Sequence, residues 1–225
     1  AALAIPSLSG NRYFGVMPAA AAGAMTAAIF AVFTLGLATN QVATGLALTI
    51  FGTGLSGLVG APFVGGTVDG LQAVSIPVLS DLPVLGGLLF QLDLLAYVAF
   101  VMLALVACFL NKSRVGLILR AVGNNHDSAH ALGYSVLRVR SAAVIFGGLM
   151  AGLAGAYLPL VLTPHWSEGM TAGRGWIALA LVVFASWMPW RIFIGALLFG
   201  GITTIQLVGQ ARGWEMPSQC LPMLP

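Results

Sequence analysis

Residues 92–110 read LDLLAYVAFVMLALVACFL, an apolar run whose only charge, Asp93, stands at its edge. A helix needs about 20 apolar residues to cross a membrane, because about 30 Å of hydrocarbon is covered at a rise of about 1.5 Å per residue. Runs of the same kind occupy Gly15 to Leu37, Ser141 to Leu162 and Arg191 to Val208. These four runs predict transmembrane helices.

The composition extends this conclusion to the whole chain. Of the 225 residues, 59% are hydrophobic and 7% are charged, whereas soluble domains carry about 25% charged residues. Two weaker segments add to the four strong ones. Val42 to Gly60 is long enough but rich in glycine, and Gly175 to Trp187 has the length of a half-helix or re-entrant segment. We therefore expect an all-α, polytopic transmembrane helical bundle with about five or six membrane segments, forming a single domain over residues 1–225.

The ends of the chain suggest a longer parent protein. The sequence begins at Ala1 without an initiator methionine and stops at Leu224-Pro225. Ala1 to Ser7 lacks the basic flank of a signal peptide. We expect that an N-terminal span and a final C-terminal span are missing.

A basic island between Asn111 and Arg140 orients the bundle. It holds five of the nine Lys and Arg residues against a single acid, Asp127; the five are Lys112, Arg114, Arg120, Arg138 and Arg140. Clustered Lys and Arg in a short loop mark the cytoplasmic side. Residues 111–140 are therefore predicted to be a cytoplasmic loop, and residues 61–91 and 163–173 fall outside. The net charge of +3 comes largely from this loop, so it indicates orientation and not binding of nucleic acid, whose binders spread basic residues over an exposed face.

Small residues predict a close helix crossing. Gly148 with Gly152, and Ala151 with Gly155, stand four residues apart in the third strong run. Such spacing leaves one helix face nearly bare, so that a neighbouring helix can approach closely.

Two motifs resemble chemical sites but lack the right context. Gly52-Thr53-Gly54-Leu55-Ser56-Gly57 matches a dinucleotide-binding pattern, yet it lies in an apolar run and not in a strand–turn–helix unit. His126 and His130 stand at i and i+4, as in the zinc proteases, but the intervening acid is Asp127 and not Glu. His165 falls across the membrane and cannot be a third ligand. We expect no cofactor, no metal and no enzymatic chemistry.

The energy source is also constrained by the sequence. The chain has no Gly-rich phosphate loop of the GxxxxGK(S/T) type. It has no acid deep within a span, where proton-coupled carriers place theirs. Uphill transport would therefore draw its energy from another protein.

The basic island contains residues that resemble a known family. Residues 116–125 read GLILRAVGNN and are followed by Ser128-Ala129 and by Gly133-Tyr134-Ser135-Val136. This pattern resembles the cytoplasmic coupling segment of bacterial ABC importer permeases of the ribose, nucleoside and branched-chain amino acid class. Residues 168–180, EGMTAGRGWIALA, are similar to the simple-sugar and nucleoside branch. The resemblance covers about residues 40 to 225.

This resemblance implies a multi-pass permease subunit in the bacterial inner membrane. It would pair with itself or with a paralogue, bind cytoplasmic ABC ATPase subunits at the loop 111–140, and take a simple sugar or nucleoside from an extracytoplasmic binding protein. The implied coupling residues are Arg120, Gly123, Asn125, Ser128, Ala129, Leu132, Gly133 and Val136.

The coupling segment is expected to hold a short helix, roughly Asn124 to Gly133, with an apolar face of Ala129, Leu132 and Val136 that could enter a groove of the ATPase. The chain has Asn124 and His126 where the family usually has Glu and Pro. Asn125 or Ser128 could then cap the helix. As an alternative, Arg120, Arg138 and Arg140 only hold lipid headgroups or fix the orientation.

A neutral polar solute needs hydrogen-bonding and stacking groups without fixed charge. The candidates for its path are Asn40, Gln41, Thr44, Thr49, Ser56, Trp176, Trp187, Gln206 and Gln210, with Asn40, Gln41, Thr44, Ser56, Trp176 and Gln206 preferred. Glu168 and Arg174 could form an ion pair that shapes the outer gate. Two other classes stay open: a self-powered secondary carrier or channel, and a membrane zinc metalloprotease built on His126 and His130.

Overall fold

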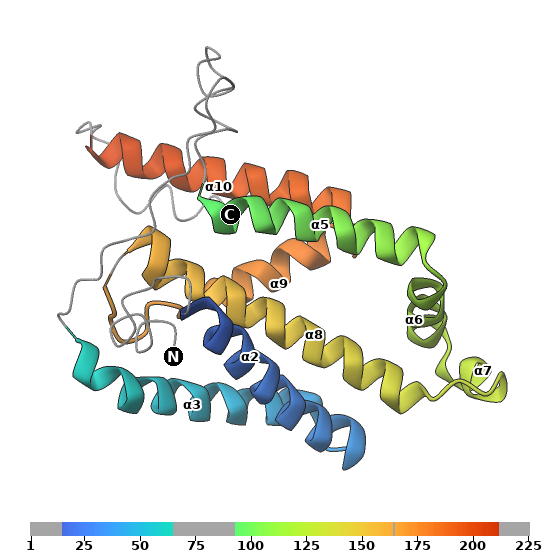
Figure 1. Ribbon diagram of the computed structural model, residues 1–225. Coiled ribbons are helices and arrows are strands. Elements are labelled where there is room, and N and C mark those ends of the chain that lie inside the picture. The colour runs from blue at the N-terminus through green and yellow to red at the C-terminus, as the bar shows by residue number, and fades with distance from the viewer. Residues whose placement is uncertain (1–14, 65–92, 164, 212–225) are drawn as a thin grey trace. The chain divides into compact units, whose positions relative to one another are not determined.

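The computed structural model describes residues 15–64, 93–163 and 165–211. Most of the described residues are helical (Figure 1), which confirms the all-α prediction. In chain order the helices are α2 (Val16–Ala31), α3 (Gln41–Gly60), α5 (Leu94–Lys112), α6 (Arg114–Asn124), α7 (His126–Ala131), α8 (Val136–Tyr157), α9 (Arg174–Phe184) and α10 (Pro189–Ala211). The predicted outer loop 61–91 lies mostly outside the described residues.

Four helical stretches are long and apolar enough to cross a membrane: Val16–Gly36, Gln41–Phe63, Leu94–Lys112 and Val136–Leu162. The first and last include π-helical turns, Val32–Gly36 and Leu158–Leu162. Three of these stretches match strong predictions, and the glycine-rich segment near 42–60 also proves to be a full helix.

The last span of this set begins earlier than predicted. Its helix, α8, starts at Val136 and not at Ser141. Arg138 and Arg140 therefore stand on the first turns of a membrane helix, whereas the sequence placed them in the loop. A long side chain near a helix end can keep its charge at the membrane interface while its stem stays in the apolar layer.

Helices α2 and α8 pack against each other along their length (Figure 1). A methyl group added at Gly148 would meet the Cβ of Ala27, and one added at Gly152 would meet the carbonyl oxygen of Ala19. Gly23 faces Gly148 from the other helix. The predicted close crossing at Gly148 and Gly152 is confirmed, because only residues without a side chain allow the two backbones to approach so closely. Gly155 has open space around it and takes no part.

The buried core of this bundle is small. Ala19, Ala156 and Leu160 form it, while many large apolar side chains such as Ile50 and Leu58, which are 74% and 76% exposed, cover the outside. A soluble protein rarely exposes so much apolar surface. Such a surface is that of helices that face lipid or neighbouring helices.

The chain divides into two compact units, residues 1–171 and 172–225. The second unit contains α9 and α10. Leu181 packs against Gly195 between these helices, and Ser186 and Trp187 turn the chain with φ angles of 51° and 61°. At 11 residues, α9 has the length expected for a half-helix or re-entrant segment. The single domain expected over 1–225 stays a prediction.

Candidate functional site

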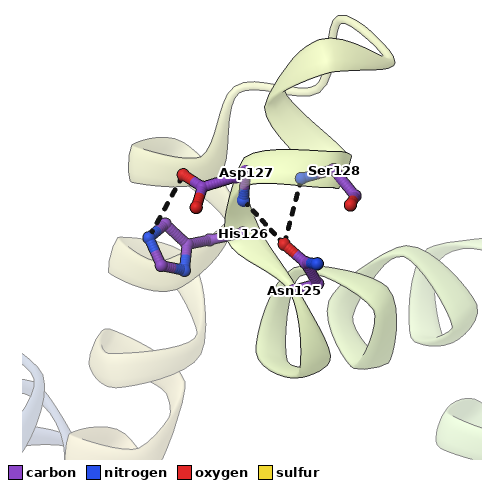
Figure 2. A network of polar contacts seen from close by, with 4 residues as sticks. All are labelled: Asn125, His126, Asp127 and Ser128. Carbon is purple, nitrogen blue, oxygen red and sulfur yellow. Dashed lines mark hydrogen bonds and ion pairs between the residues drawn. The ribbon is translucent and has the colours of Figure 1, made fainter.

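The segment between α6 and α8, which is predicted to be cytoplasmic, is organised by one side chain, Asn125. Its Oδ1 accepts hydrogen bonds from the backbone N–H groups of Asp127 and Ser128, both at 3.1 Å (Figure 2). A side-chain oxygen in this position satisfies N–H groups that the first turn of a helix leaves without partners. Of the two caps considered from the sequence, the structure uses Asn125. The helix that it starts, α7, covers His126–Ala131, within the predicted 124–133.

Gly133 ends the same helix. Its φ angle is +85°, and its N–H donates to the carbonyl oxygen of His130 at 2.9 Å, while the N–H of Tyr134 donates to that of Ala129 at 3.2 Å. This pair of bonds is a Schellman motif, in which glycine is favoured because a Cβ disfavours positive φ. A cap at one end and a glycine at the other therefore hold a helix of six residues in place.

The apolar face expected on this helix needs correction. Ala129 is only 3% exposed, so it packs inward and cannot enter a partner's groove, and Val136 is half-buried at the start of α8. Leu132 is 76% exposed. The apolar group presented outward by the predicted trio is therefore Leu132.

Residues 114–124 form a separate amphipathic helix, α6, which the sequence reading missed. Ser113 caps it, since Ser113 Oγ accepts a hydrogen bond from the N–H of Gly116 at 2.9 Å. Val122 is buried on its apolar side. Two signals were present in the sequence: a serine cap, and apolar residues at positions 115, 118, 119 and 122 with helical spacing.

Two predicted coupling residues lie on α6. The guanidinium of Arg120 donates to Oδ1 of Asn111, the penultimate residue of α5, at 3.2 Å. Gly123 stands in the last turn with nothing within 4 Å of where a Cβ would lie. Arg120 thus ties α6 to α5, and Gly123 leaves open space beside the start of α7.

The zinc-protease alternative finds no third metal ligand near His126 and His130 among the described residues. Nε2 of His126 lies 3.4 Å from Oδ1 of Asp127 (Figure 2). Within the described ranges, no three His, Cys, Asp or Glu residues are placed to hold a metal ion. The pair is exposed at the surface of the loop.

A cleft of about 740 Å³ lies between α2, α3 and α8. One face of α3 supplies hydroxyl groups to it at helical spacing, from Thr49, Thr53 and Ser56, and α2 adds Thr26. Glycines at 45, 52 and 57 on the same face keep the cleft wide. Thr49 and Thr53 donate their hydroxyl protons to carbonyl oxygens one turn back, at 2.8 and 2.7 Å. Their lone pairs remain able to accept hydrogen bonds from a solute.

The loop after α8 covers one end of this cleft. Trp166 lies against Gly60 of α3, and the carboxylate of Glu168 lies against Gly57. Trp166 also pairs with Val64 in an isolated β-bridge. A smaller pocket of about 210 Å³ adjoins the cleft here and shares Ser56 and Trp166 with it. The loop after α8 and the end of α3 were both predicted to lie outside, and their contact is consistent with that orientation.

The other path candidates of the first unit cluster at the opposite end of α3. Asn40 caps this helix, and its Oδ1 accepts hydrogen bonds from the N–H groups of Val42 and Ala43 at 2.9 and 3.2 Å. Thr44 Oγ1 donates to the carbonyl oxygen of Asn40 at 2.9 Å. Gln41 is exposed on the first turn. These groups are about 18–24 Å from Ser56 along the helix axis, and none of them is among the described residues that line the cleft.

The remaining candidates belong to the second unit. Arg174 and Trp176 are exposed on the first turn of α9, and Trp187 is exposed in the turn before α10. Gln206 and Gln210 lie in α10, with side chains outside the described part of the structure. The gate pair of Glu168 with Arg174 joins two separately described units and stays a prediction.

Comparison with known proteins identifies the family. The family described as "Branched-chain amino acid transport system / permease component" matches residues 1–222. A putative glucose ABC transporter permease protein of Haloferax volcanii is 39% identical over 211 residues, which cover 92% of this chain and 64% of that protein. A nucleoside ABC transporter permease protein of Lactococcus lactis is 32% identical over 220 residues, 95% of this chain and 69% of the relative. No solved structure matches.

A third relative, a guanosine ABC transporter permease protein of Bacillus subtilis, is 28% identical over 203 residues, 88% of this chain and 64% of its own length. The chain thus spans about two thirds of the curated relatives that it matches. The helical bundle, the four spans and the family match over 222 of the 225 residues agree. The chain belongs to the family of permease components typified by branched-chain amino acid transport systems.

Proposed function

We propose that this chain is the membrane-spanning part of a permease subunit in an ATP-driven ABC importer for a simple sugar or a nucleoside. The family consists of multi-pass membrane proteins that act as transport components. The three relatives are named for glucose, nucleosides and guanosine. These solutes share a neutral ring bearing hydroxyl groups.

The cleft between α2, α3 and α8 carries this proposal. Its lining combines neutral hydroxyl groups with apolar and glycine surface, and Glu168 is the one charged residue among the described residues that line it. Ligand sites in proteins are mostly apolar with a few placed polar groups, and a neutral solute does not need a charged partner. The volume of about 740 Å³ lies within the usual range for small-molecule sites, about 300–1,000 Å³.

Trp166 and Glu168 would receive the solute at the outer end of this cleft. An indole ring offers a flat apolar face on which a sugar or base ring can stack. A carboxylate accepts hydrogen bonds from sugar hydroxyls. In this proposal an extracytoplasmic binding protein delivers the solute to this end, and Glu168 with Arg174 shapes the gate.

The energy comes from ATPase subunits bound at α7. This helix is short and held at both ends, and Leu132, the residue that follows it, is exposed, so the segment could move as a rigid body with a partner's groove. A second permease subunit, identical or paralogous, would complete the pathway. The remaining coupling residues support this rigid segment: Asn125 and Gly133 define its ends, and Ser128 and Ala129 form it. Arg120 ties the preceding α6 to α5, Gly123 stands in the last turn of α6, and Val136 begins α8.

Uptake by the reconstituted transporter tests the cleft. Ser56→Phe places a ring among the lining groups and should abolish uptake of labelled glucose or guanosine while leaving ATPase subunits bound. Leu58→Phe is the matched control, because Leu58 is two residues away on α3 and 76% exposed. Equal uptake by the two variants would contradict a solute path in this cleft.

The same assay separates ATP-driven import from the secondary-carrier alternative. The purified permease should give no uphill uptake without its ATPase subunits and ATP. Accumulation of solute by the permease alone would instead identify a self-powered carrier.

A further inference from the structure

A second cavity in the first unit has a different character from the solute cleft. It is a groove of about 830 Å³ between α5, α6 and α8. Among the described residues that line it, all but Arg138 are apolar. On α5 the lining runs from Met102 to Leu110, and on α8 from Arg138 to Phe146, in each case along one helix face.

One end of the groove lies beside the basic island. Val115 and Leu119 of α6 line it from the side of the basic island, where Gly116 lets α6 turn tightly against the carbonyl oxygen of Phe109 at the end of α5. Positive charge places this end at the cytoplasmic face. From Leu110 to Met102 the wall then rises about 12 Å toward the membrane centre, which is close to the thickness of one leaflet's hydrocarbon layer, about 15 Å.

Charge complementarity indicates what occupies the groove. Arg138 stands at its cytoplasmic end, and its guanidinium carries five N–H donors that suit phosphate oxygens. The single acid of the island, Asp127, lies on α7 beside His126. Positive charge therefore meets an apolar channel at the level of the inner headgroups, as in other basic pockets between helices on the cytoplasmic side that bind anionic lipids.

We propose that the groove between α5, α6 and α8 binds one anionic phospholipid of the inner leaflet, with an acyl chain along Phe109 and Phe146 and the headgroup phosphate on Arg138. The site adds to the proposed transport function and does not depend on it. Its bound lipid would fill the space between α5 and α8 and hold α6, and with it the neighbouring α7, at the membrane surface.

Native mass spectrometry of the delipidated permease tests this proposal. Phosphatidylglycerol and phosphatidylcholine with the same acyl chains are added in turn, and retained lipid is counted per chain. We expect one tightly held phosphatidylglycerol, and a preference over phosphatidylcholine that falls about tenfold in Arg138→Ala, the factor expected for losing one charge-assisted hydrogen bond. Arg138→Lys should keep part of this preference, which would show that the loss is not misfolding.

Two further variants locate the lipid. Arg120→Ala removes the same charge from the island, but Arg120 bonds to Asn111 and does not line the groove, so the preference should persist. Ala142→Trp fills the groove and should reduce retention of both lipids while Arg138 remains.

Several results would overturn the proposal. Equal loss in Arg120→Ala and Arg138→Ala would show a diffuse attraction to the basic island. Full retention in Ala142→Trp would place the lipid elsewhere. Displacement by glycerophosphoglycerol as efficient as by the intact lipid would show a phosphate site without an acyl channel, and no retained lipid would show that protein fills the groove.

Discussion

Adjacent glycines on α8 show how one residue position decides a helix contact. A Cβ at Gly148 would meet α2, whereas a Cβ at Gly147 would have open space. We expect Gly148→Ala to lower the free energy of unfolding by about 1–3 kcal/mol, because overpacking forces the backbones apart. Gly147→Ala should raise it by up to about 1 kcal/mol through better helix propensity. Thermal unfolding of the two variants in detergent measures the difference, and equal effects would contradict the crossing.

Two neighbouring asparagines, Asn124 and Asn125, differ in their role at the N-terminal cap of α7. Asn125→Ala removes the acceptor for two backbone N–H groups and should destabilise the short helix by about 1 kcal/mol. Asn124→Ala changes the residue before it, which ends α6 and has no such role in the cap. Hydrogen exchange of the α7 amides should therefore accelerate about fivefold in the first variant only. Comparable exchange in both variants would mean that tertiary packing, and not the cap, holds α7.

At the scale of elements, the sequence predicted helices better than it predicted sites. Long apolar runs predict spans because a helix must match the thickness of the bilayer. The four-residue spacing of Gly148 and Gly152 predicted the close helix crossing. The cleft could not be predicted from the sequence in this way, because it forms only where α2, α3 and α8 pack together. Ser56 and Thr49 line the cleft, and their role in a solute path stays a prediction, whereas Asn40 and Thr44 form hydrogen bonds at the other end of α3.

The corner between α5 and α6 depends on Gly116. A Cβ there would meet the carbonyl oxygen of Phe109 and the Cα of Leu110, so Gly116→Ala should push α6 away from α5. Gly123→Ala is the control on the same helix, because space around Gly123 is open. We expect the first variant to lower thermal stability by an amount equivalent to about 1–3 kcal/mol, and the second to leave it unchanged or raise it slightly. A stable Gly116→Ala protein would contradict the tight corner.

At the scale of the molecule, the packing can be compared with the orientation that the charges predict. The basic island alone placed 111–140 inside and the loop after α8 outside. The packing is consistent with this predicted topology, because that loop contacts Gly57 and Gly60 at the predicted outer end of α3. In the proposed transporter, the cleft would open toward the outer face and the docking segment would lie at the cytoplasmic face.

The proposed coupling between the ATPase subunits and the permease can be tested at Leu132. Leu132→Asp replaces the exposed apolar side chain with a charge that would be costly to bury in a partner's groove. We expect capture of the ATPase subunits by the tagged permease, and solute-stimulated ATP hydrolysis, to fall at least tenfold, since burying an unpaired charge costs more than about 1.4 kcal/mol. Leu132 lies beyond the end of α7, so the helix itself should persist.

Ala131→Asp controls for charge alone, because Ala131 is the preceding residue and is also exposed. If docking depends on an apolar anchor at 132, this variant should retain most of the ATPase subunits. Equal loss in both variants would show that the segment merely avoids negative charge, and equal retention would place the coupling surface elsewhere on the basic island. A loss confined to Leu132→Asp, with lipid retention at Arg138 intact, would separate the docking of the ATPase from the anchoring of α6, two roles that the sequence alone left joined in one loop.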